Sequence, residues 1–104
     1  MTGTPSQIEW AELIQPRVNA EFDRVAKALR SAAANQVQQE QVNTVAIIGI
    51  LEEKRVEVMA NERAGYFIRE WQEITDQVRR MISQDPRHRA IQANRAVERE
   101  KLTA

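Results

Sequence analysis

Five carboxylates in the second half of the chain have types and spacings that could do chemistry. Glu52, Glu53 and Glu57 follow one another closely, and Glu73 and Asp76 come later in the chain. On helices, residues three or four apart share a face, so Glu53 pairs with Glu57 and Glu73 pairs with Asp76. If the two pairs converged, four carboxylates would hold a hard cation such as Mg²⁺ against a substrate triphosphate.

This pattern resembles the MazG-like family of all-α nucleoside triphosphate pyrophosphohydrolases. In that family a Glu-Glu-x-x-Glu motif on one helix and a Glu-x-x-Asp motif on the next bind the metal. Residues 73–76 (EITD) match the second motif, whereas residues 52–57 (EEKRVE) contain one residue more than the first. The resemblance implies Mg²⁺-dependent hydrolysis as an alternative function, with Glu53, Glu57, Glu73 and Asp76 as ligands. The other interpretation places these acids on a solvated face beside neighbouring arginines.

Arginines in the last part of the chain suggest a second kind of contact. The tail after Pro86 is rich in basic residues and contains two acidic ones, Glu98 and Glu100. Such a helix could bind a nucleic acid or an acidic partner. Against nucleic acid, the net charge of the chain is zero, and the tail has no aromatic side chain to stack on bases. The candidate anion contacts are Arg87, Arg89, Arg95 and Arg99.

Other catalytic chemistries find no support in the residues present. The chain has no Cys and a single His, His88, so thiolate sites and nucleophile triads cannot be assembled. There is no phosphate-binding glycine loop. His88 follows Pro86 in a basic stretch and lacks a Glu three residues before it, which favours a solvated His over a metal ligand. We therefore predict no catalytic residue, no cofactor and no resident metal, and regard the protein as most simply non-enzymatic.

Length and composition favour one all-α domain. The chain has 104 residues, of which 42% are hydrophobic and 29% charged, as in globular proteins. Only three Gly and three Pro occur, and aromatics make up 5%. Few turn residues and few aromatics favour long helices over many short strands. We expect an elongated helical hairpin or bundle of three to four helices with coiled-coil-like packing.

The apolar stretch from Val45 to Leu51 is the strongest single feature of the sequence. It is too short to span a bilayer, and it surrounds the whole circumference of a helix, so one stripe cannot cover it. A second stripe runs from Phe67 to Val78 in steps of four and three residues. Both predict burial against copies of the chain or another protein. The predicted interface residues are Val45, Ile47, Ile48, Ile50, Leu51, Phe67, Trp71, Ile74 and Val78.

Capping residues, prolines and glycines mark the expected ends of the helices. Ser6 and Glu9 fit a capping box, Pro16 predicts a kink or break near Gln15, and Gly65 is the best candidate for a helix stop. The Gln-rich stretch after residue 33 favours a turn over a continuous helix, and Asp85-Pro86 predicts a helix start. The expected spans are residues 6–14, 16–34, 40–63, 66–84 and a basic helix over 86–102.

Together these features predict a homo-oligomeric structural, assembly or adaptor protein that acts through helix–helix interfaces. The partner is expected to be a second copy of the chain, with another protein as the other choice. The first residues have neither a basic region nor an apolar core of a signal peptide. No stretch is long and apolar enough for a membrane helix, so we expect no membrane partner and a cytoplasmic location.

Overall fold

The structure is a computed structural model that describes residues 1–103. Within these residues it contains five helices and no strand, which confirms the all-α class, with one helix more than the predicted upper number. The helices are α1 (Pro5–Ala33), α2 (Gln38–Met59), α3 (Ala64–Glu70), α4 (Ile74–Ser83) and α5 (Pro86–Thr103). The molecule is elongated, with dimensions of 61 × 23 × 19 Å.

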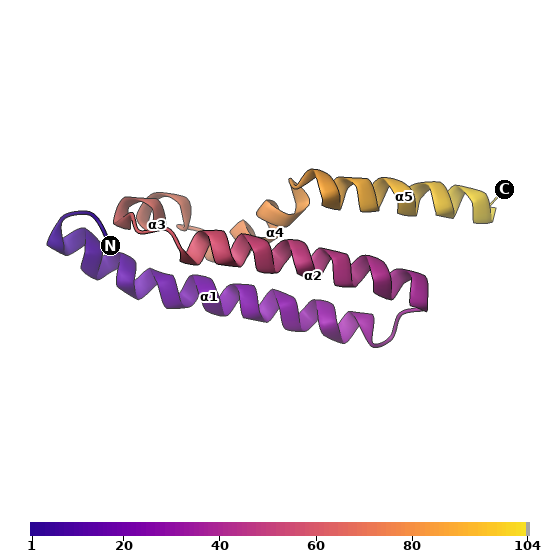
Figure 1. Cartoon of the computed structure of the whole chain (residues 1–104), viewed down its shortest axis with the longest axis horizontal. Helices are drawn as coiled ribbons and strands as arrows, with labels where there is room; N and C mark the ends of the chain where they lie inside the picture. The colour runs from indigo at the N-terminus through magenta and orange to yellow at the C-terminus, as the bar shows by residue number, and fades with distance from the viewer. Residues whose placement is uncertain (104) are drawn as a thin grey trace.

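Helices α1 and α2 form a long antiparallel hairpin that makes one layer of the molecule (Figure 1). The turn between them, residues 34–37, lies in the Gln-rich stretch where a turn was predicted. Gln41 fastens it by donating from Nε2 to the carbonyl oxygen of Ala33 at 2.9 Å. Farther along, the Arg55 guanidinium on α2 binds Asp23 on α1 at 2.7 Å. These polar contacts fix the register of the hairpin.

The shorter helices form the second layer and cross from one hairpin helix to the other. Helix α3 packs on α1, α4 packs on both α1 and α2, and α5 packs on α2 and α4. The start of α1 and the last turns of α5 lie toward opposite ends of the long axis (Figure 1). The core runs between the layers and includes Phe22, Leu51, Phe67, Trp71 and Val78.

Helix α1 is continuous, so the break predicted at Pro16 is wrong. The helix begins at Pro5, one residue before the expected start, because the capping box is formed by Thr4 and Gln7 and not by Ser6 and Glu9. Pro16 lies inside the helix with its ring exposed. Packing of Val18 and Phe22 continues the buried face beyond the proline, and this tertiary burial outweighs the lost backbone hydrogen bond.

The expected single helix over residues 66–84 is also wrong, because the chain breaks between Glu70 and Ile74. Trp71 leaves the helical conformation, with φ −115° and ψ 35°, and its ring is buried 5.8 Å from the ring of Phe22. The break lets α3 follow α1 while α4 reaches α2. Gly65 does not stop a helix here; it lies within the first turn of α3.

The residues before α1 are held by backbone hydrogen bonds to the segment between α2 and α3. The backbone N–H of Ala64 donates to the carbonyl oxygen of Thr2 at 2.8 Å, and Thr2 in turn donates to Glu62. Gly3 has φ +146°, a conformation that favours glycine. This bridge fastens the start of α1 to the start of α3.

Candidate functional site

The four carboxylates predicted as alternative metal ligands do not converge. Glu53, Glu57, Glu73 and Asp76 are all exposed. Glu53 accepts from Arg87 at 2.7 Å, and Glu73 accepts from Arg80 at 3.0 Å. Among residues 1–103, no three His, Cys, Asp or Glu side chains lie close enough to hold one metal ion. The arrangement that Mg²⁺ chemistry requires is therefore not assembled in the described part of the chain.

The arginines of the tail are largely committed to contacts within the chain. Arg95 on α5 pairs with Glu40 on α2 at 3.1 Å and is mostly buried. Arg87 binds both Asp85 and Glu53, and Arg99 also has an interaction of its own. Arg89 is exposed. The pairs of Arg87 and Arg95 join α5 to α2, so these two side chains do not present a free basic surface.

Asp85 is a titratable group whose environment strongly perturbs its pKa. Its side chain is buried between α4 and α5, where Arg87 donates to it from the backbone N–H at 2.9 Å and from Nε and Nη2 at 3.0 Å. Lys54 adds an ammonium group at 3.2 Å. These donors, the Arg87 guanidinium first, hold the pKa of Asp85 well below its usual range. The cap predicted at Asp85-Pro86 is thus confirmed, and it also links α5 to α2.

Most of the predicted interface residues lie inside the chain's own core. The structure buries Ile47, Ile50 and Leu51 between the layers, together with three residues of the second stripe: Phe67, Trp71 and Val78. Ile48 and Ile74 are half-buried. Val45 alone of the nine is exposed, at 63% of its surface. An interface on this fold must therefore use a different row of side chains, beginning with Val45.

That row lies on the side of α2 that faces away from the second layer. Val42, Val45, Gly49 and Val56 recur at spacings of three, four and seven residues, so they share one side of the helix. The three valines are exposed at 58%, 63% and 69%. We call this row the α2 outer face. Sequence reasoning missed Val42 and Val56, although their spacing from Gly49 was visible, because the continuous apolar run beside them gave a stronger signal.

A shallow hollow lies within the α2 outer face. It is lined by Gly49, Glu52, Glu53, Val56 and Glu57. The first four of these occupy positions i, i+3, i+4 and i+7, which are the positions that form the hole for a side chain from a facing helix in knobs-into-holes packing. The absence of a side chain at Gly49 deepens this hole.

Comparisons with known proteins add no relative. No family model, no curated protein and no solved structure matches the chain. Within residues 1–103, none of the helices combines the length and the apolar character needed to cross a bilayer. The function must therefore be inferred from the geometry of the surface.

Proposed function

We propose that the protein is a homo-oligomeric structural or adaptor module in which the α2 outer faces of two copies pack against each other. The supporting observation is the row of exposed valines centred on Gly49 on the central helix of the fold. Isolated apolar side chains on a surface are ordinary, but several of them aligned on one side of a helix are typical of an interaction site.

Gly49 supports close contact with another helix. A side-chain carbon added at Gly49 would meet no atom within 4 Å, so packing within the chain does not require glycine there. Its backbone is helical and needs no positive φ. Glycine inside a helix costs about 1 kcal/mol relative to alanine. Approach of a second backbone at this point gives that glycine a physical reason.

An antiparallel arrangement suits this row. Val42 and Val56 each lie seven residues from Gly49, so a two-fold axis at Gly49 sets Val42 of one copy opposite Val56 of the other. Val45 then faces the hollow beside Glu53 on the facing helix and can enter it as a knob.

Charge favours the same orientation. The acidic side chains that line the hollow, Glu52, Glu53 and Glu57, lie in the C-terminal half of α2, whereas the acid of the N-terminal half, Glu40, pairs with Arg95 on α5. A parallel pair would bring Glu53 of both copies together. An antiparallel pair instead places these acids against the N-terminal half, which avoids like-charge repulsion.

The substitution V45D tests this interface. Light scattering on a size-exclusion column should give a dimer mass for the native chain over a range of concentrations. V45D places a charge in the hollow and should weaken the dimer at least tenfold, since an unpaired buried charge costs well over 1.4 kcal/mol.

The matched control is V37D. Val37 is also exposed, at 73%, but it lies before α2 as its N-cap, where Asp is well tolerated. V37D should keep the dimer mass of the native chain. A native chain that stays monomeric at its highest soluble concentration, or equal dimerisation by V45D and the native chain, would contradict the proposal.

A further inference from the structure

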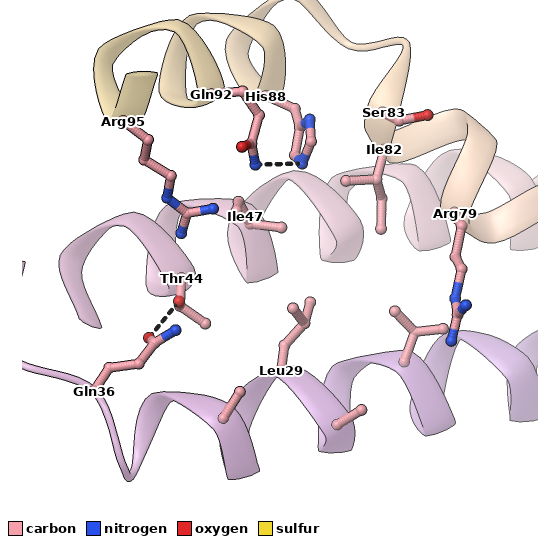
Figure 2. A pocket seen from close by; sticks show the side chains of 13 residues that line it. Leu29, Gln36, Thr44, Ile47, Arg79, Ile82, Ser83, His88, Gln92 and Arg95 are labelled. Atoms are coloured by element: carbon pink, nitrogen blue, oxygen red, sulfur yellow. Dashed lines mark hydrogen bonds between the residues drawn. The ribbon is translucent and has the colours of Figure 1, made fainter. Parts of the chain in front are cut away.

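A groove on the opposite side of α2 from the outer face has the character of a ligand site. It lies among α1, α2, α4 and α5 and has a volume of about 460 Å³ (Figure 2). That volume is in the range of sites for small molecules. Leu29, Ile47 and Ile82 supply apolar surface from three different helices. Each of these side chains faces the space enclosed by the helices in Figure 2.

Polar groups at the rim of the groove are all neutral or basic. His88, Gln92 and Arg95 point toward the groove from one side of α5, and Arg79 extends from α4 (Figure 2). Among the residues that the structure describes, no Asp or Glu belongs to the lining. Such a lining disfavours cationic ligands and favours an anion.

The charge balance singles out Arg79 as the anion contact. Arg95 already shares its charge with Glu40, and His88 approaches the Gln92 side chain at 3.5 Å. Among the described residues, Arg79 has neither an ion pair nor a side-chain hydrogen bond, whereas its neighbour Arg80 is paired with Glu73. Arg79 therefore brings an uncompensated guanidinium to the rim of an apolar groove. Guanidinium groups match carboxylates with two parallel hydrogen bonds.

We propose that this groove binds a small amphiphilic carboxylate. Its apolar part would lie over Leu29, Ile47 and Ile82, and its carboxylate would accept hydrogen bonds from Arg79. The groove is separate from the α2 outer face, so ligand binding and self-association can be tested independently.

Three probes with the same ten-carbon chain and different head groups test the ligand class. Titration calorimetry on the full chain should show saturable binding of decanoate at one site per chain. Decanol should bind at least fivefold more weakly, and decyltrimethylammonium more weakly still. Absence of saturable decanoate binding, or equal affinity for decyltrimethylammonium, would overturn the proposal. The same titration on V45D should give the decanoate affinity of the native chain, whatever its oligomeric state.

Two adjacent arginines provide a matched pair of variants. R79Q removes the free guanidinium and should weaken decanoate binding roughly tenfold, with little change for decanol. R80Q removes an arginine that is paired with Glu73 outside the groove and should leave both affinities unchanged. A28F adds a ring to an exposed lining residue of α1 and should weaken both probes. An equal loss in R79Q and R80Q would overturn the role of Arg79, and unchanged affinities in A28F would overturn the location.

Discussion

A single buried carboxylate connects three helices in this fold. Asp85 caps the start of α5, follows the end of α4, and accepts from Lys54 on α2. Arg87 extends the contact to Glu53, also on α2. Hydrogen bonding to Asp85, and then to Glu53, raises the pKa of Arg87 above its usual range. Removing Asp85 would leave Lys54 without this partner and Arg87 with Glu53, so we expect the docking of α5 on α2 to weaken.

The depressed pKa of Asp85 predicts a loss of stability in acid. Above about pH 4, the usual value of an aspartate, Asp85 is ionised in both the folded and the unfolded chain, so its contribution is fully present. As pH falls below that value the unfolded chain takes up a proton that the folded chain resists, and the contribution declines. We expect D85N to be less stable than the native chain at pH 7 and the difference to shrink toward pH 2.

Urea unfolding at a series of pH values measures this difference. Asn keeps the acceptor that caps α5, so D85N isolates the charge. The control is D76N, since Asp76 is exposed and makes no ion pair among the described residues. D76N should follow the native curve. A D85N curve that runs parallel to the native curve over the whole range would show that the charge of Asp85 does not stabilise the fold.

At the scale of the element, α1 carries a local penalty that its packing overcomes. Pro16 cannot donate to the carbonyl of Glu12, yet α1 extends unbroken from Pro5 to Ala33. Replacing Pro16 by Ala should restore that bond. Because proline inside a helix is up to about 3 kcal/mol less favourable than alanine, we expect P16A to raise the free energy of unfolding by about 1–3 kcal/mol.

Thermal and urea unfolding of P16A and the native chain test this prediction. Pro16 is exposed, so the substitution removes little buried surface. A20G, at another exposed position of α1, is the comparison in the opposite direction and should lower stability by about 1 kcal/mol. Reduced stability of P16A would show that the geometry imposed by the proline is needed for the packing of α1 on α3.

The sequence predicted the helix boundaries that depend on residues close to them in the chain. The turn after Ala33 lies in the Gln-rich stretch, and Asp85-Pro86 is a typical helix start. Both were predicted from these residues. The break at Trp71 could not be read in the same way, because its stripe keeps a regular helical spacing. It arises from packing against Phe22, a residue distant in sequence.

The candidate surface was harder to predict than the fold for a related reason. The sequence shows that residues 45–51 need burial, but it does not say which side chains the same chain will cover. The second layer covers Ile47, Ile50 and Leu51 and leaves Val45 exposed. The groove was missed as well, since its lining comes from four helices and no local motif joins them.

As a whole molecule, the chain is thin for its length. Its Cα radius of gyration is 16.8 Å, against about 13 Å for a compact domain of this size. A thin molecule has little interior, so large side chains such as Trp10 and Leu13 also stay exposed, at 57% and 66%. These two lie near the N-terminal end of α1, far along the molecule from Val42, and could mediate end-to-end contacts instead.

Small-angle X-ray scattering distinguishes the two modes of assembly. Gly49 lies near the middle of α2, so an antiparallel pair about it should widen the particle and keep its longest dimension near the 61 Å of one chain. Contact through Trp10 and Leu13 would nearly double that dimension. V45D should scatter as a monomer of unchanged length, which provides the reference. A native dimer close to twice that length would move the interface from the α2 outer face to the end of α1.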